Sequence, residues 1–501
     1  MNEKLNELKY LMGEVDDLSK AASILSWDQQ ANMPPGGAAA RASQLGTLSR
    51  LSHEKFTDER VGRLLYELSK ETRDLAYEDD TASLIRVLKR DYEKATRLPS
   101  TFVAELAEAS GLGTTSWAQA RAANNWDGFS DHLKRMIELK QREAEYLGYH
   151  DKMYDALLDT YEPDMKTRQV SEMFDTVRRE LVPLVRAISE HADRVDDSVV
   201  HRPYEHARQW DLAQEALRAI GYDFERGRMD QVPHPFCTTF SNRDVRVTNR
   251  VLPNFFNSAF FGALHEGGHA LYELGSPDRF ERTGLAGGTS LSVHESQSRM
   301  WENLVGRSRA FWEFFFPKFA AKFPEHAADM DAEKMYRAVS KVQPSYIRVE
   351  ADEVTYSLHV MLRFEAENML VENKLSVNDL PAWWDEAMSS YLGVTPPDVA
   401  HGALQDVHWS LGYYGYFPTY SLGTFFSAQL FDKAREQLGD LDEQFARGEF
   451  APLREWLTEN IYQHARKYTL NEIATRVTGE PLQTRSYIAY LKKKYSEIYG
   501  L

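Results

Sequence analysis

The chain has 501 residues, of which 43% are hydrophobic and 27% are charged, and its formal net charge is −17. This composition is that of an ordinary soluble globular protein and excludes disordered and membrane-embedded classes. The acidic balance argues against a broad surface for nucleic acid or for an anionic membrane, so we expect neither as a partner.

Cys237 is the single cysteine, which excludes an internal disulfide and favours a reducing compartment. The first residues contain no apolar segment of the kind found in secretory signals. No apolar run reaches the length needed to cross a membrane. These three observations predict a cytoplasmic protein.

Long helices are the expected structure of most of the chain. There are 28 glycines and 19 prolines, roughly 9% of the residues against an average of about 12%. Apolar residues recur with helical spacing from the first stripe onward, which includes Leu5, Leu8 and Met12. No flexible linker divides the chain, so we predict one domain over residues 1–501, in which the helices up to about residue 120 form a lid.

Two later segments show different patterns. Residues 244–248 alternate over a β-branched run, which predicts a small strand or hairpin within 234–251. Residues 346–373 contain no helix breaker, so we expect a long helix there with Arg348 near its start. A simple i,i+4 ion pair with Asp352, worth only a few tenths of a kcal/mol, is the alternative to a chemical role for Arg348.

The strongest chemical signal is the segment His265-Glu266-Gly267-Gly268-His269, an H-E-x-x-H pattern. It lies in a predicted helix that follows Pro253 and ends at Gly275-Ser276-Pro277, as a glycine followed by a proline indicates. Histidines at i and i+4 project from one face and can bind one metal ion together. Glu266 would then stand beside the metal as the general base.

A polar helix face is the alternative interpretation of this pattern. The two adjacent glycines favour the metal site, because each glycine costs about 1 kcal/mol relative to alanine inside a helix. A helix that contains both must need the close approach of another backbone or of a substrate.

A catalytic zinc ion takes three protein ligands and keeps one open position. Glu295 is the candidate third ligand, on a helix that returns after the glycine-rich loop 284–289. Two alternatives remain. Ser292 and Glu295 have the spacing of a capping box, and His294 could bind the metal instead, although adjacent helical residues point about 100° apart.

Two segments near residues 402–423 also contain groups suited to chemistry. Residues 402–409 include Asp406 and His408 beside a glutamine and a tryptophan. The following glycine-containing loop holds four tyrosines, which are Tyr413, Tyr414, Tyr416 and Tyr420. Their hydroxyl groups could point into a cleft, and simple aromatic packing is the alternative for each of them.

Taken together these segments resemble the carboxypeptidase Taq family of zinc metallocarboxypeptidases. Seven family-like blocks appear in order along most of the chain. They are residues 26–30 with Met33-Pro34, 234–236, 244–248, 265–269, 294–297, 347–352 and 402–409. The resemblance implies a mostly helical metallopeptidase, similar to the neurolysin and angiotensin-converting-enzyme type, with a deep central cleft and one small sheet near the active site, whose motifs lie within 230–425.

The resemblance also implies an activity. It implies zinc, or cobalt in its place, bound once per chain by His265, His269 and Glu295. It implies removal of single C-terminal residues from peptides with a free C-terminus, with broad specificity and poor action on C-terminal proline. A homodimer is expected on the same ground.

Further site residues follow from similarity to cleft residues of the wider group. His408 and Tyr420 are the candidates to stabilise the oxyanion that forms on the scissile carbonyl. Arg348 is the preferred group for the substrate carboxylate and Arg246 the second, because the guanidinium fork suits a carboxylate. Two other functions stay open: an oligoendopeptidase with the same zinc chemistry, and an inactive zinc protein that binds peptides.

Overall fold

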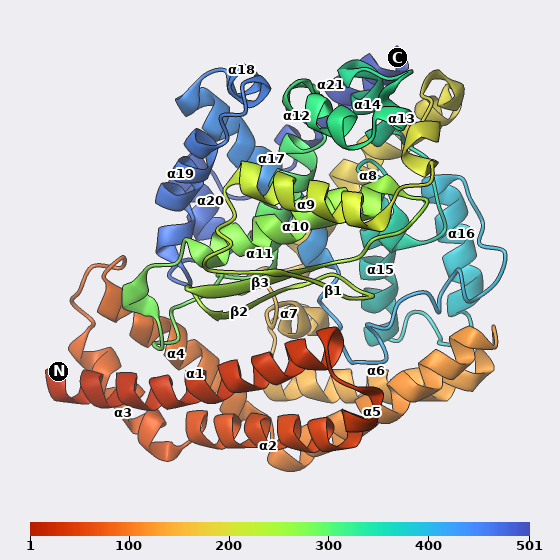
Figure 1. Cartoon of the computed structure of the whole chain (residues 1–501). Helices are drawn as coiled ribbons and strands as arrows, with labels where there is room; N and C mark the ends of the chain where they lie inside the picture. Colours follow the sequence, from red (N-terminus) through yellow and green to blue (C-terminus); the bar gives the residue numbers. More distant parts are fainter.

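The computed structural model describes all 501 residues and is mostly helical, as predicted, with one three-stranded sheet (Figure 1). The helices before the sheet are α1 (Asn2–Ala31), α2 (Ala38–Phe56), α3 (Glu59–Glu71), α4 (Asp80–Arg97), α5 (Ser100–Ala122), α6 (Asp127–Leu147), α7 (Met153–Leu158), α8 (Thr167–Ser189) and α9 (His206–Ile220). The helices from the sheet to residue 371 are α10 (Phe256–Leu274), α11 (Leu291–Arg299), α12 (Arg309–Lys322), α13 (Pro324–Ala327), α14 (Ala332–Val339) and α15 (Tyr356–Val371). The last helices are α16 (Leu380–Leu392), α17 (Pro418–Leu438), α18 (Leu441–Ala446), α19 (Ala451–Asn460), α20 (Leu470–Thr478) and α21 (Arg485–Tyr499).

The sheet contains the predicted hairpin and one further strand. β2 (Cys237–Ser241) and β3 (Asp244–Asn249) are antiparallel, with Cys237 opposite Val247. β1 (Met229–Gln231) runs parallel to β3 on its other side, which gives the order β1-β3-β2. A three-residue strand shows no alternation in the sequence, so β1 could not be predicted.

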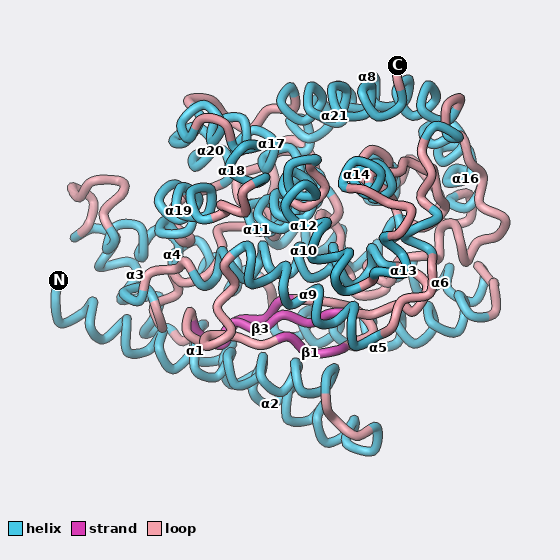
Figure 2. Tube along the Cα trace, turned by 45° about the horizontal axis from the view of Figure 1, so that its top comes forward, coloured by secondary structure: helices cyan, strands magenta, loops and turns pink.

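The sheet lies between the helix α1 and the helix α10 (Figure 2). Val245 and Val247 on one face are fully buried in a small cluster that also contains Ala263 and Ala270 of α10. Arg246 points to the opposite face, where its guanidinium lies 4.4 Å from the Trp27 ring of α1. The alternation in the sequence therefore corresponds to the two faces of the sheet: the apolar face packs against α10 and the polar face lies towards α1.

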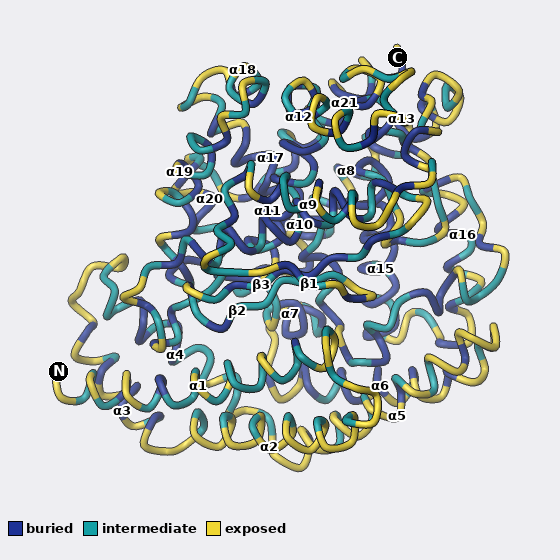
Figure 3. The backbone as a smooth tube through the Cα atoms, viewed as in Figure 1, coloured by how far each residue is buried: buried dark blue, intermediate teal, exposed yellow.

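Most buried residues belong to one hydrophobic core. The largest cluster comprises 95 buried residues, which come from the chain between Ala120 and Tyr499. Helices α1, α3 and α4 have a separate small cluster that also contains Phe280, Leu285 and Ala465 of the main body. α2 packs on α1 but has no buried residue at all, and it forms an exposed edge of the molecule (Figure 3).

The helix predicted from residue 346 begins ten residues later. Arg348 lies in a short 3₁₀ turn, Arg348–Glu350, and α15 starts at Tyr356. The carboxylate of Asp352 accepts the amide hydrogens of Gln343, Val354 and Thr355, and these bonds hold the preceding segment in a turn. The predicted start of the helix is therefore wrong, and the alternative ion pair is absent, since Arg348 pairs with Asp406 instead.

None of the helices combines the length and the apolar character that a membrane span requires.

Candidate metal centre

The helix α10 has the predicted bounds and explains its two glycines. A side-chain carbon at Gly268 would overlap the carbonyl oxygen of Gln297 and lie 2.7 Å from the Cα atom of Ser298 on α11. A carbon at Gly267 would lie 2.6 Å from a methyl group of Leu217 on α9. The expected close approach of another backbone is thus confirmed at Gly268, and it brings α11 next to the two histidines.

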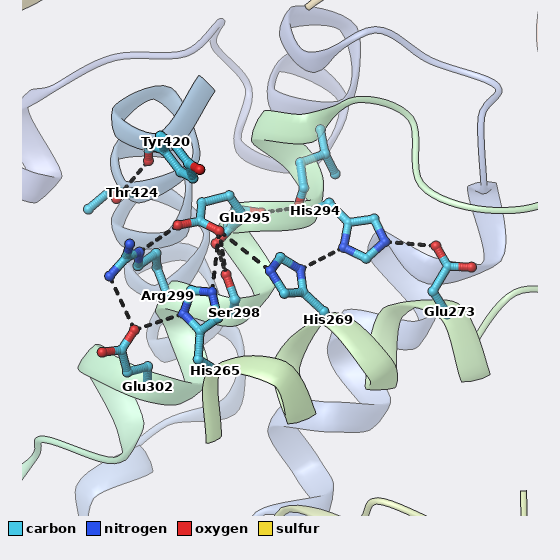
Figure 4. A network of polar contacts seen from close by, with 12 residues as sticks. His265, His269, Glu273, His294, Glu295, Ser298, Arg299, Glu302, Tyr420 and Thr424 are labelled. Atoms are coloured by element: carbon cyan, nitrogen blue, oxygen red, sulfur yellow. Dashed lines mark hydrogen bonds and ion pairs between the residues drawn. The ribbon is translucent and has the colours of Figure 1, made fainter. Parts of the chain in front are cut away.

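His265, His269 and Glu295 form the one cluster of the chain that could hold a metal ion, with ligand atoms within 4.8 Å of one another. Oε2 of Glu295 lies 3.6 Å from Nε2 of His265 and 3.5 Å from Nε2 of His269 (Figure 4). Atoms bound to one tetrahedral zinc ion at about 2.0–2.1 Å lie roughly 3.3 Å apart. The three side chains therefore fit a zinc-sized ion without a large rearrangement.

Glu295 is not part of a helix cap. Ser290 is the N-cap of α11, and its hydroxyl oxygen accepts the amide hydrogen of Val293. The Glu295 carboxylate instead accepts hydrogen bonds from Arg299 Nε at 2.7 Å and from Ser298 Oγ at 3.0 Å. Arg299 holds Oε1 and Ser298 holds Oε2, the oxygen that faces the two histidines. The capping-box interpretation is therefore wrong.

The ring of His265 is fixed from behind by Glu302. Its Nδ1 atom lies 2.9 Å from Oε2 of Glu302, which also accepts a bond from Arg299. Glu302 belongs to a π-helical turn, Met300–Val305, that directly follows α11, and such turns occur frequently at functional sites. A ligand histidine whose other nitrogen donates to a carboxylate is a common arrangement at metal sites.

The ring of His269 is fixed by a chain of two groups on its far side. Its Nδ1 atom lies 2.7 Å from Nδ1 of His294, and Nε2 of His294 lies 2.7 Å from Oε1 of Glu273. His294 therefore points at the back of His269 and not at the metal position. Its alternative assignment as a metal ligand is corrected to a supporting role.

Glu266 lies between the two histidines in sequence and is almost completely buried. Burial raises its pKa to about 7, which brings the carboxyl group close to neutral pH. In contrast, burial lowers the pKa of His269 to about 4, so its ring is neutral and able to bind a metal. For His265, the Glu295 and Glu302 carboxylates outweigh burial and raise the pKa to about 8.

Arg348 belongs to a second buried cluster, centred on Asp406. Asp406 Oδ1 accepts from Arg348 Nη2 at 2.8 Å, and Oδ2 accepts from Arg363 Nε at 2.7 Å. Arg348 Nη1 also lies 3.0 Å from the hydroxyl oxygen of Tyr356. Two arginines facing one aspartate leave a net positive charge in a largely buried place. The structure thus places the 347–352 and 402–409 segments in direct contact.

Tyr420 lies on the side of Glu295 away from His294, and His408 is linked to it through the ring of Tyr416 (Figure 4). The Tyr420 side chain on α17 is beside the Glu295 carboxylate (Figure 4). The His408 ring is 5.4 Å from the Tyr416 ring, which is in turn 5.4 Å from the Tyr420 ring. Burial lowers the pKa of His408 to about 3 and keeps the pKa of Tyr420 well above its ordinary value, so both are neutral hydrogen-bond donors.

Arg246 lies apart from these clusters. Its guanidinium forms a two-point ion pair with Asp244 and stacks between Trp27 and Phe240. It makes no hydrogen bond or ion pair with the histidine cluster. The contact nevertheless joins the 26–30 and 244–248 segments, which are more than 200 residues apart in the sequence.

Several supporting residues were missed by the sequence reasoning. They are Glu273, Arg299, Glu302 and Arg363. Glu302 follows Glu295 by seven residues, two helical turns, and Glu273 follows His269 by four, so both spacings were visible. No rule of spacing distinguishes such residues from ordinary surface charges until the partner helix is placed.

The comparisons with known proteins agree with this geometry. Residues 7–495 match the model of the carboxypeptidase Taq (M32) metallopeptidase family. Thermostable carboxypeptidase 1 of Thermus thermophilus is 42% identical over 492 residues, with 96% of each chain covered. Carboxypeptidase 1 of Bacillus subtilis is 36% identical, with 98% of each chain covered.

Solved structures give the same result. The M32 carboxypeptidase of Deinococcus radiodurans R1 superposes with a TM-score of 0.97 at 40% identity, over the whole of both chains. The metallocarboxypeptidase 1 of Trypanosoma cruzi has a TM-score of 0.94 at 33% identity, with 99% of this chain and all of that chain covered. The similarity therefore extends over the entire fold as well as the motifs.

Proposed function

The chain belongs to the carboxypeptidase Taq (M32) metallopeptidase family and is a metal-dependent peptide hydrolase, and from its site we propose a specific mode of action. The protein removes single residues from the free C-terminus of peptides, with broad side-chain specificity and poor action on C-terminal proline. The observation that carries the proposal is the convergence of His265, His269 and Glu295 beside the buried Glu266.

His265, His269 and Glu295 are the residues that would hold the metal, with zinc as the proposed ion and cobalt as a substitute. Two imidazoles and one carboxylate are a donor set found in catalytic zinc sites. When bound there, the metal supplies Lewis acidity: it polarises a carbonyl group and lowers the pKa of a water molecule towards about 7.

Glu266 acts as the general base and then as the general acid. Its carboxylate takes a proton from the attacking water and later delivers it to the amine that leaves. A pKa raised to about 7 by burial suits both steps near neutral pH. Glu295 cannot act as the general base, because its carboxylate already accepts hydrogen bonds from Arg299 and Ser298.

Tyr420 and His408 stabilise the negative charge that develops on the scissile carbonyl oxygen. Both are half-buried and neutral, so a phenol hydroxyl and an imidazole N–H are available as donors. A donor of this kind contributes roughly 3–4 kcal/mol of transition-state stabilisation. Tyr420 is the preferred group because it lies next to Glu295 (Figure 4).

Arg348 binds the substrate carboxylate. The cluster of Arg348, Arg363 and Asp406 has one positive charge in excess and is shielded from solvent, and such a charge attracts a carboxylate strongly. Arg246 is the second candidate, although Asp244 already neutralises it.

Three further properties belong to the same proposal. The helices up to about residue 120 act as a lid over a deep cleft that contains the site. The protein is a homodimer, for which α2 offers a helix without any buried residue. With its single Cys237, it works in the reducing environment of the cytoplasm.

Matched peptides test the activity. The zinc- or cobalt-loaded protein is incubated with one peptide that has a free C-terminus and with its amidated twin, and the products are followed by mass spectrometry. We expect stepwise loss of single residues from the free peptide only, abolished by a chelator and by Glu266→Gln. Internal cleavage of both peptides would support the oligoendopeptidase instead. Metal binding without any cleavage would support an inactive peptide-binding protein.

A further inference from the structure

The first turn of α11, the helix that carries Glu295, rests on the turn between α7 and α8. The amide of Leu291 donates to the carbonyl oxygen of Tyr161 at 3.5 Å. The next residue of that turn, Glu162, directs its carboxyl group at the same end of the helix. The hydroxyl groups of Ser292 and Ser290 and the amide of Ser292 are the groups that lower its pKa there.

Glu162 is an unusual residue in its surroundings. Its side chain is completely buried, and neither carboxylate oxygen has a hydrogen-bond partner of good geometry. The hydroxyl oxygen of Ser292 is equally buried and also without a partner. Burial raises the pKa of Glu162 to about 7. A buried carboxyl group without a cation nearby is strongly unfavourable in most places, so its position needs an explanation.

The end of a helix supplies that explanation. The first amides of a helix lack partners within it, and the aligned peptide dipoles place partial positive charge there. A carboxyl group at that end offers an acceptor and a complementary charge. Glu162 is itself fixed, because its amide donates to the Leu158 carbonyl at 2.9 Å and its carbonyl accepts from the Met165 amide at 3.2 Å.

We propose that Glu162 is a positioning residue, which holds the first turn of α11 and through it directs the Glu295 carboxylate at His265 and His269. The direct tethers of that carboxylate, Ser298 and Arg299, are on α11 itself and move with it. The helix therefore has to be fixed to the body by other contacts. This proposal rests on the proposed metal site.

The same turn also contacts the tyrosine loop. The Tyr161 ring packs edge-on against the Tyr416 ring, with centroids 5.3 Å apart. One short segment thus supports the ligand helix through Glu162 and the loop before Tyr420 through Tyr161. A change at Glu162 should nevertheless act first on α11, which its carboxyl group faces.

Two variants, Glu162→Leu and Glu162→Gln, test the proposal. In the metal-free protein, we expect Glu162→Leu to speed hydrogen exchange of the amides of residues 291–293 by about tenfold or more. We also expect about tenfold weaker cobalt binding, measured by competition with a chromophoric chelator, in the range found when supporting groups of metal sites are removed. The visible absorption bands of the bound cobalt should shift, because the position of Glu295 has changed. Glu162→Gln keeps the shape and one acceptor, so it should recover part of each loss.

Glu365→Gln is the matched control. Glu365 is a half-buried carboxylate on α15 that pairs with Arg178 of α8 and accepts from the hydroxyl of Tyr391. We expect it to lower the melting temperature without a change in cobalt affinity or spectrum. Wild-type affinity, spectrum and exchange rates in Glu162→Leu would overturn the proposal; if that variant does not fold, the same wild-type values in Glu162→Gln would overturn it. A wild-type protein that binds no metal would instead refute the metal site, and the exchange rates would still decide on Glu162.

Discussion

The Nδ1 atom of His269 lies 2.7 Å from the Nδ1 atom of His294, and this contact fixes the proton positions on both rings. Nε2 of His294 lies 2.7 Å from the Glu273 carboxylate, which can only accept when it is ionised. His294 therefore carries its proton on Nε2 and accepts at Nδ1 from His269. Nε2 of His269 is left with a free lone pair, which faces Glu295 and the metal position.

Replacement of His294 by leucine should weaken metal binding. The variant removes the acceptor of the His269 Nδ1 proton, so the ring can rotate or change its protonated nitrogen. We expect the zinc dissociation constant to rise about 10- to 100-fold, the range found for such supporting groups. Competition with a chromophoric chelator measures it. His401→Leu, at an exposed histidine paired with Asp398, is the control and should leave the constant unchanged. An unchanged constant in His294→Leu would refute the supporting role.

Replacement of Gly423 by alanine should disturb the third ligand. The new methyl carbon would lie 2.7 Å from the Cβ atom of Glu295 and 2.7 Å from the carbonyl oxygen of Ser292. Because both contacts are shorter than ordinary van der Waals distances, α17 and α11 have to move apart. We expect a loss of roughly 1–3 kcal/mol in stability, typical of overpacking, together with weaker zinc binding.

Gly46→Ala is the matched control for that variant. Gly46 lies inside the helix α2, and a methyl group there would meet no atom within 4 Å. We expect a gain of up to about 1 kcal/mol from helix propensity and no change in zinc affinity. Thermal unfolding and chelator competition measure both quantities. Equal behaviour of the two alanine variants would show that the contact between α17 and α11 does not restrict Gly423.

The two histidines of the candidate metal site could be predicted from the sequence because their signal is local, whereas Glu295 lies on a separate helix and was proposed from its place after the glycine-rich loop and from the family resemblance. Two histidines four residues apart face the same way on any helix, and two tolerated glycines indicate a close neighbour. The hairpin around β3 was likewise visible from alternation. Each of these features depends on residues within one element, where the period of the side chains is known.

The supporting contacts could not be predicted because they join distant elements. Arg348 was placed in a long helix, since nothing near it breaks a helical pattern. The turn that holds it depends on the Asp352 carboxylate, and its partner Asp406 lies 58 residues away. The Asp352 side chain could either hold a turn before a new helix or form an ion pair within one continuous helix. The packing of the segment around Asp406 decides between the two.

Replacement of Arg348 by lysine should impair recognition of the free C-terminus. Lysine keeps the charge but loses the planar fork that binds a carboxylate at two points. A hydrogen bond to a charged group is worth about 1.5–3 kcal/mol, which corresponds to roughly 10- to 100-fold in kcat/KM. We expect this loss for free-carboxylate peptides without a change in bound metal.

The companion variant for Arg348→Lys is Arg246→Lys. Arg246 is exposed in part and already paired with Asp244, so we expect a much smaller effect on the same peptides. Steady-state kinetics and metal analysis of the two variants are sufficient to compare them. A larger loss in Arg246→Lys would transfer the carboxylate-binding role from Arg348 to Arg246.

Glu367 on α15 should make the stability of the protein depend on pH. It is completely buried, and its carboxylate accepts three neutral donors: the Tyr154 hydroxyl at 2.5 Å, the Trp409 indole at 2.8 Å and the Gly415 amide at 2.9 Å. Burial outweighs these bonds and raises its pKa from 4.5 to about 7. The folded protein therefore holds this proton more tightly than the unfolded chain does. Stability from this group is fully present below pH 4.5 and is lost as the pH rises towards 7.

Replacement of Glu367 by glutamine removes this dependence. Each unit of pKa shift corresponds to about 1.4 kcal/mol, so the wild-type protein loses roughly 3 kcal/mol at most across the window. The glutamine cannot accept at both ends and gives up about one hydrogen bond, worth about 1 kcal/mol. We expect the variant to be less stable than the wild type near pH 5 and to equal or exceed it near pH 8.

Urea midpoints of the metal-free proteins measure the difference, and Glu449→Gln at the exposed Arg447 pair serves as the control. The wild type and the variant share their other buried carboxyl groups, such as Glu162 and Glu266, so the contributions of these groups cancel when the two stabilities are subtracted. A constant gap between Glu367→Gln and the wild type from pH 5 to pH 8 would therefore mean that Glu367 is ionised in the folded protein throughout that range.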